Sequence, residues 1–136
     1  MILTETVSIQ THSICHWVDI TPTVENIVKN SGVLVGVVTV TSLHTTASIT
    51  VNENGDSAVE SDFFMKLARL VPRDEPYYSH REGNSDSHVK TSLVGTDISR
   101  SIVDGGILLG TWQSIYFCEF DGPRSKRSFT VTVIGE

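Results

Sequence analysis

The feature that most limits the possible folds is an alternation of polar and apolar residues that returns along much of the chain. A period of two places successive side chains on opposite faces of a β-strand, so each alternating segment predicts a strand with a buried face. Residues 33–43 are rich in Val and Thr and predict a central strand. Strands are predicted at residues 4–10, 13–20, 33–43, 49–51, 113–120 and 129–133, with shorter pieces within 98–109.

Three helices are predicted between these strands, because apolar residues there recur at helical spacing and helix-ending signals follow them. The first helix begins at Thr21-Pro22 with Thr21 as its expected cap, the second follows a turn at residues 52–56, and Ser85 or Asp86 is expected to cap the third. The three helices end at Gly32, Pro72 and Gly95. The order of elements predicts an α+β fold with a mostly antiparallel sheet rather than alternating βαβ units. The length of 136 residues predicts one domain, residues 1–136.

The composition limits the kinds of partner that the protein is expected to bind. The formal net charge of −6 argues against a general nucleic-acid-binding surface, whose affinity comes from Lys and Arg. The first residues lack a secretory signal, and no segment approaches the roughly 20 apolar residues that cross a bilayer. We therefore expect a cytoplasmic protein with no nucleic-acid or membrane partner. Cys15 and Cys118 are then expected as buried free thiols, with one disulfide as the alternative.

The densest set of chemically active side chains lies in residues 82–88, Glu-Gly-Asn-Ser-Asp-Ser-His, with His80 just before them. Polar density alone is typical of any loop. Two further polar clusters lie at the ends of predicted strands, one around His44 and one at residues 121–127. These three clusters form the candidate site.

The histidines suggest a metal or an acid/base site. His44, His80 and His88 all lie in polar segments at the ends of elements. Three neutral imidazoles that converge can hold a divalent metal, because each offers a lone pair. Their spacing matches no short zinc motif, and each histidine alone is more simply explained as a hydrogen-bonded turn residue.

Carboxylates and basic residues complete the candidates. Glu53, Asp56, Glu82 and Asp86 lie near the starts of predicted helices, where Asp56 and Asp86 alone would favour the positive helix end. Near imidazoles such groups serve as general bases or orient metal ligands. Three of the ten basic residues fall at positions 124–127. This cluster is either an exposed hairpin tip or an anion clamp.

At these residues the sequence resembles the YjbQ family. The resemblance covers nearly the whole chain and rests on five blocks in the same order. The blocks are His44-Thr45-Thr46-Ala47-Ser48, Asn52-Glu53, residues 82–90, Gly110-Thr111-Trp112-Gln113 and residues 119–124. Members of that family are described as having a secondary thiamin-phosphate synthase activity.

The resemblance implies a small α+β fold that assembles as a homotrimer, with a polar cleft near the subunit interface that holds a metal or an anion. Carried over by position, the metal ligands would be His44, His80 and His88. The catalytic residues would be Glu82, Asp86, Glu53 and Asn52. The anion or substrate contacts would be Asn84, Thr45, Thr46, Arg124 and Gln113.

Three functions follow as expectations. The first is a metal-dependent enzyme acting on a small phosphorylated or anionic substrate. Three histidines favour zinc as its divalent metal, with magnesium as the alternative. In it, thiamin-phosphate synthase chemistry is a transferase side activity. The second is a trimeric protein that binds a small phosphate or a metal without turnover. The third is a purely structural trimer.

Overall fold

Eight strands form two antiparallel sheets in the computed structural model, which describes all of residues 1–136. The larger sheet has the order β1 (Ile2–Ile9), β8 (Arg127–Gly135), β3 (Gly36–Ser42), β5 (Asp97–Val103) and β6 (Gly106–Ile107). The smaller sheet has the order β2 (His16–Asp19), β7 (Gln113–Glu119) and β4 (Ala47–Glu53). The predicted α+β class with antiparallel strands is confirmed. The first two strands do not form a hairpin, because β1 pairs with β8 and β2 with β7.

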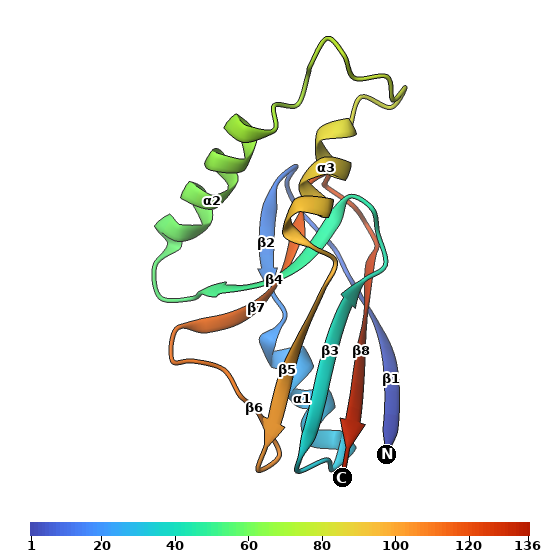
Figure 1. Cartoon of the computed structure of the whole chain (residues 1–136), viewed down its shortest axis with the longest axis vertical. Coiled ribbons are helices and arrows are strands. Elements are labelled where there is room, and N and C mark those ends of the chain that lie inside the picture. The colour runs from blue at the N-terminus through green and yellow to red at the C-terminus, as the bar shows by residue number, and fades with distance from the viewer.

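The core lies between the two sheets, and α1 (Thr21–Ser31) closes one end of it. Alternation along β8 shows how the sequence builds this layer: Phe129, Val131 and Val133 are buried while the residues between them face outward. The helix turns Val24 and Val28 toward the same core and ends at Gly32, whose φ of 75° suits glycine. Figure 1 shows α1 behind the larger sheet.

The start of α1 differs from the prediction in one respect. Thr21 does not cap the helix. Its hydroxyl accepts a hydrogen bond from the Ile115 amide at 2.7 Å, which ties the helix to β7 instead. The Thr21 hydroxyl therefore does not accept from the free backbone amides of the first turn of α1.

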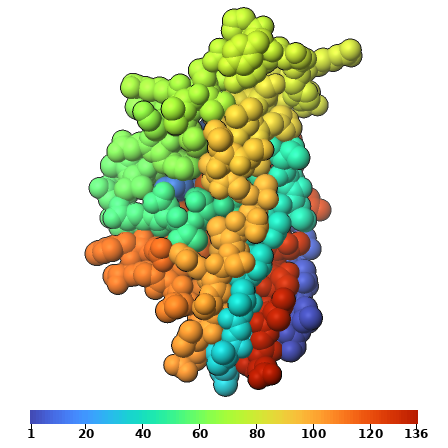
Figure 2. Space-filling view, in the orientation of Figure 1, coloured from blue at the N-terminus to red at the C-terminus, as the bar shows by residue number.

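The other two helices lie on the outer face of the smaller sheet. They are α2 (Ser57–Leu70) and α3 (Ser85–Val94), and the segment 71–84 joins them as an overhang at the top of the molecule (Figures 1 and 2). The Asp56 carboxylate caps α2 by accepting from the Ala58 amide at 2.9 Å. The residue before α3 is Asn84, not Ser85 or Asp86 as predicted, and its side chain makes no capping bond.

The outer face of the larger sheet carries no helix, and Figure 2 shows it uncovered below α3. Hydroxyl side chains pair across its strands, as in Thr4 with Thr132 at 3.0 Å and Thr39 with Ser99 at 2.7 Å. No helix of the protein is long and apolar enough to span a membrane.

Both cysteines are free thiols. Cys118 is buried in β7, and Cys15 is half-buried just before β2. Burial raises the pKa of both thiols above the ordinary value, because the thiolate is poorly solvated in these positions. The disulfide alternative is therefore not realised in this structure.

Candidate functional site

The three polar clusters meet in one cleft at the end of the larger sheet nearest α3. Its volume is about 320 Å³, and no hydrophobic residue lines it. The β3–β4 loop, the segment before α3 with the first turns of α3, and the end of the β7–β8 connection each contribute to it. The lining residues are His44, Thr45, Thr46, His80, Glu82, Asn84, His88, Arg124 and Arg127.

Hydrogen bonds between the connections explain why these distant segments converge. The Leu43 amide donates to the Ser128 carbonyl at 3.2 Å, so the β3–β4 loop stays beside the start of β8. The Phe120 amide donates to the Thr46 carbonyl at 3.2 Å. Asn84 fixes the third segment, because its side-chain NH2 donates to the Asp121 carboxylate at 2.8 Å.

A buried ion pair forms the base of the cleft. Glu119 is 0% exposed and Arg127 is 2% exposed. The Arg127 Nε donates to the Glu119 carboxylate at 2.7 Å, and Nη2 donates to its second oxygen. The Thr11 hydroxyl and the Asp121 amide donate to the same carboxylate at 2.8 and 2.9 Å. Burial alone would raise the pKa of Glu119, but these donors together hold it below the ordinary value.

Both arginines of the cleft are oriented by carboxylates and keep one end free. Arg124 donates from Nε to the Asp121 carbonyl and from Nη2 to the Asp121 carboxylate, at 2.9 and 2.8 Å. Arg127 uses Nε and Nη2 on Glu119 and Thr46. Its Nη1 makes no hydrogen bond within the chain and is not among the buried unpartnered atoms, so it reaches the surface of the cleft.

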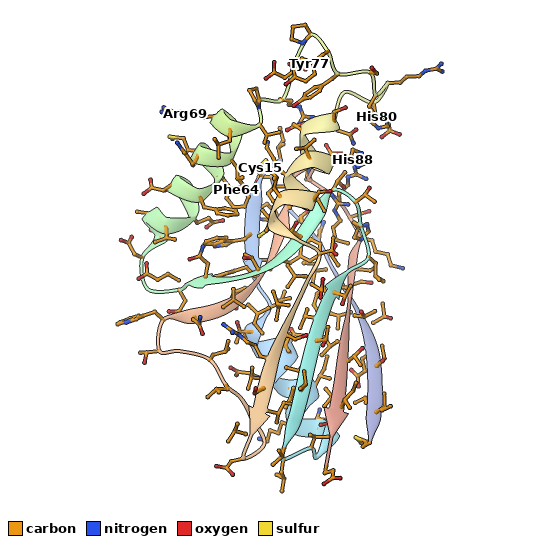
Figure 3. All side chains as sticks on the ribbon, in the orientation of Figure 1. Cys15, Phe64, Arg69, Tyr77, His80 and His88 are labelled. Atoms are coloured by element: carbon orange, nitrogen blue, oxygen red, sulfur yellow. The ribbon has the colours of Figure 1, made fainter.

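The three histidines of the cleft have different surroundings. The Nε2 of His44 accepts from the Ser128 amide at 2.8 Å, which places its proton on Nδ1. Burial, followed by the charge of Arg127, lowers the pKa of His44. The rings of His80 and His88 lie 5.1 Å apart and perpendicular to each other. Figure 3 shows both on the side of α3 that faces away from α2.

The residues of one chain do not fit the predicted three-histidine metal site. No group of three or more His, Cys, Asp or Glu side chains lies close enough together to hold a metal ion. The lone pair of His44 Nε2 is also already used by the Ser128 amide. The zinc or magnesium cofactor stays a prediction that this geometry does not support.

Four predicted site residues lie outside the cleft. Asp86, in the first turn of α3, is 1% exposed and pairs with Lys90 Nζ at 2.8 Å. Glu53 lies at the far end of β4, in a separate hollow with Trp17 and Glu60. Its neighbour Asn52 accepts from the Glu53 amide, and Gln113 accepts from the Gly110 amide. These four residues belong to the sequence blocks that predicted the site, but the fold places them away from the cleft.

Sequence reasoning missed the pair that organises the cleft. The basic cluster at positions 124–127 predicts an exposed tip or an anion clamp for Arg127, and the alternation of residues 113–120 predicts only a strand around Glu119. A usable signal was present, because Arg127 shares the inward-facing parity of Phe129 and Glu119 shares that of Phe117. A charged residue at a core-facing position of each of two strands predicts that the two pair.

Comparisons with known proteins show the family to which the chain is similar. Residues 5–136 match the family model described as UPF0047 protein YjbQ-like. A UPF0047 protein of Methanocaldococcus jannaschii is 48% identical over 119 residues, 88% of this chain and 85% of that protein. YugU of Bacillus subtilis, also named a UPF0047 protein, is 38% identical over 125 residues, 92% of this chain and 95% of its own.

Solved structures show the same fold. A crystal structure of a YbjQ-like protein of unknown function from Sulfolobus solfataricus has a TM-score of 0.95 at 30% identity, covering 100% of this chain and 99% of its own. An uncharacterized conserved protein of the yjbq/upf0047 family from Clostridium acetobutylicum has a TM-score of 0.92 at 43% identity, covering 96% and 99%.

These findings overturn the functional prediction. A metal-dependent enzyme with thiamin-phosphate synthase activity is wrong as the expected function, because the similar proteins are named only by their family and none of the names carries an activity. The physical reason lies in the partners of the side chains. Residue types suggested three free metal ligands, whereas the Nε2 of His44 already accepts a hydrogen bond from the Ser128 amide.

Proposed function

We propose that this chain, which belongs to the UPF0047 family of YjbQ-like proteins, binds a small molecule bearing an oxyanion. The binding site is the cleft between the three loops. The oxyanion is a phosphate, sulfate or carboxylate group. The cleft volume of about 320 Å³ suits a ligand of metabolite size.

The observation that carries the proposal is the free Nη1 of Arg127. Arg127 is 2% exposed, so its guanidinium is in contact with little water, and the unused donor at the cleft gains from an acceptor placed there. Glu119 holds the group rigidly from behind, and the free end is turned to the cleft. An oxyanion is the natural acceptor, since its oxygens match guanidinium donors.

The rest of the lining supplies further donors. Arg124 contributes a second guanidinium whose Nη1 makes no hydrogen bond within the chain. The backbone amides of Thr45 and Thr46 also donate to no atom of the chain. The lining contains two arginines and one carboxylate, that of Glu82, so its arginines outnumber its carboxylates. Fixed donors of this kind bind an anion without having to reorganise first.

The proposal extends to a homotrimer, in keeping with the family resemblance. The uncovered face of the larger sheet supports it, because that face is almost free of charge. Its outward residues are Ile2, Thr4, Thr6, Ser8, Val37, Thr39, Thr41, Asp97, Ser99, Ser101, Val103, Ser128, Thr130, Thr132 and Ile134. A sheet face in contact with water normally carries Lys and Glu side chains, whereas interface cores are depleted of them.

Titration with inorganic phosphate tests the binding proposal. Chemical-shift changes of backbone amides should concentrate at residues 44–46, 82–88 and 124–127. Arg124→Gln should weaken phosphate binding about tenfold, as expected for loss of one charge-assisted hydrogen bond. Arg73→Gln is the matched control, because Arg73 lies 3.7 Å from the same Asp121 carboxylate but does not line the cleft.

The control separates local contact from overall charge. If both variants weaken binding equally, phosphate responds only to net charge and the site is wrong. If phosphate, sulfate and acetate all leave the amides of the three loops unchanged, the protein does not bind an oxyanion there.

A further inference from the structure

A second hollow adjoins the cleft along the side of α3. It has a volume of about 380 Å³ and is lined by His80, Ser85, His88 and Val89. His80 and His88 line the oxyanion cleft as well, so the two spaces share a boundary made of imidazole rings. Figure 3 shows these two histidines side by side, one on the segment before α3 and one on the helix.

The two spaces differ in chemistry. The cleft has no hydrophobic lining residue, whereas Val89 presents an apolar side chain to the hollow and is 42% exposed there. The imidazoles meet edge to face, with an interplanar angle of 89° and 5.1 Å between their centroids. An edge-to-face pair leaves ring surface free for a third flat group, which aromatic packing favours.

We propose that the ligand is an aryl oxyanion, whose anionic group lies in the cleft and whose aromatic ring lies in the hollow against His80, His88 and Val89. This inference rests on the proposed function, because the oxyanion fixes the point from which the ring extends. The Ser85 hydroxyl also lines the hollow and would form a hydrogen bond with a polar substituent on the aromatic ring.

The alternatives fit the lining less well. A sugar phosphate would place several hydroxyls against Val89 and the imidazole faces, where only Ser85 and the ring nitrogens can hydrogen-bond to them. A free inorganic anion would leave the hollow empty, with Val89 and the ring faces in contact with water alone. A flat apolar ring removes that surface from water and needs few hydrogen bonds.

Three phosphates of similar head group test the inference: inorganic phosphate, methyl phosphate and phenyl phosphate. Phenyl phosphate should bind the wild type about tenfold more tightly than methyl phosphate, since the ring buries apolar surface. Ring-current shifts of the Val89 methyl groups should appear with phenyl phosphate and not with methyl phosphate. Val89→Ser should remove most of the tenfold preference.

Leu93→Ser is the matched control. Leu93 lies one turn further along α3 and is exposed, but it lines neither space. Its variant should keep the full preference for phenyl phosphate, and neither substitution should change the binding of inorganic phosphate.

The outcomes separate the two proposals. If inorganic phosphate binds in the cleft but phenyl phosphate binds no better than methyl phosphate, the aryl inference is wrong and the oxyanion proposal stands. If phenyl phosphate does not shift the Val89 methyl groups of the wild type, or if the Val89→Ser variant keeps the preference for phenyl phosphate, the ring lies elsewhere and the aryl inference is wrong. If none of the three ligands binds, both proposals fail.

Discussion

The buried ion pair between Arg127 and Glu119 holds together the segments that form the cleft. Each occupies a core-facing position of a strand, where an apolar side chain would be expected. Together they join β7 to β8 and fix the Thr46 end of the β3–β4 loop through the Arg127 Nη2. The pair therefore shapes the cleft as well as filling the core beneath it.

Glu119→Gln should be strongly destabilising. The amide cannot neutralise Arg127, which would stay charged in a buried position, so we expect a loss of about 3–5 kcal/mol in the free energy of unfolding. Urea denaturation measures it. Arg124→Gln removes a partner from the half-exposed Asp121 pair and should cost about 1 kcal/mol or less. Equal losses in the two variants would show that burial does not distinguish the pairs.

The same carboxylate predicts a pH dependence. Its pKa is lowered in the folded state, so the unfolded chain takes up the proton first as pH falls. The stabilisation is complete above the ordinary carboxyl pKa of 4.5 and is lost as pH falls below it toward the folded value. The difference in unfolding free energy between wild type and Glu119→Gln should therefore narrow below about pH 4.5. A constant difference down to pH 3 would contradict the assignment.

Among the elements, α2 is the one held least firmly. None of its residues is buried. Trp17 of β2 supplies its main contact, with ring centroids 5.4 Å from Phe63 and 5.9 Å from Phe64, and the Trp17 amide donates to Glu60 at 2.9 Å. Figure 3 shows Phe64 pointing from α2 toward the body of the protein. Helical propensity contributes little beyond these contacts for a helix of 14 residues.

Trp17→Ala should loosen α2 without unfolding the sheets. Each lost aromatic contact is worth about 0.5–1.5 kcal/mol, so amide hydrogen exchange in α2 should speed up about tenfold or more. Amides of β3 and β8 should exchange at nearly the wild-type rate. Met65→Ala, on an exposed side of α2, is the control and should change neither rate. Equal acceleration in α2 and β8 would mean that α2 unfolds only with the whole domain.

The elements were more predictable from the sequence than the site was. Alternation located the strands, and the signals at Gly32, Pro72 and Gly95 located the helix ends, because these effects are local. Pairing of β1 with β8 depends on residues more than a hundred positions apart, which no local pattern encodes. For the same reason, residue types suggested where His44 and Arg124 would lie but not that Ser128 and Asp121 already occupy them.

At the scale of the whole molecule, the open face of the larger sheet is the feature that a single chain leaves unexplained. Its middle row, Thr4, Thr132, Thr39 and Ser99, consists of hydroxyl side chains that are hydrogen-bonded to each other in pairs. Each pair uses one O–H donor and one acceptor within the sheet and carries no charge, so this flat row costs less to desolvate than a row of charged side chains. A second and third copy of the chain would cover it in the proposed homotrimer.

Thr132→Arg tests that assembly. A charged, long side chain at the centre of the face would be buried without a partner in the trimer, so the variant should sediment as a single chain while the wild type sediments at three times the chain mass. Ser92→Arg makes the same change at an exposed position of α3 and should leave the wild-type mass unchanged. The circular dichroism of both variants should match the wild type, since neither position is in the core. A wild type that sediments as one chain would remove the trimer. A trimer that survives Thr132→Arg would move its interface away from this face.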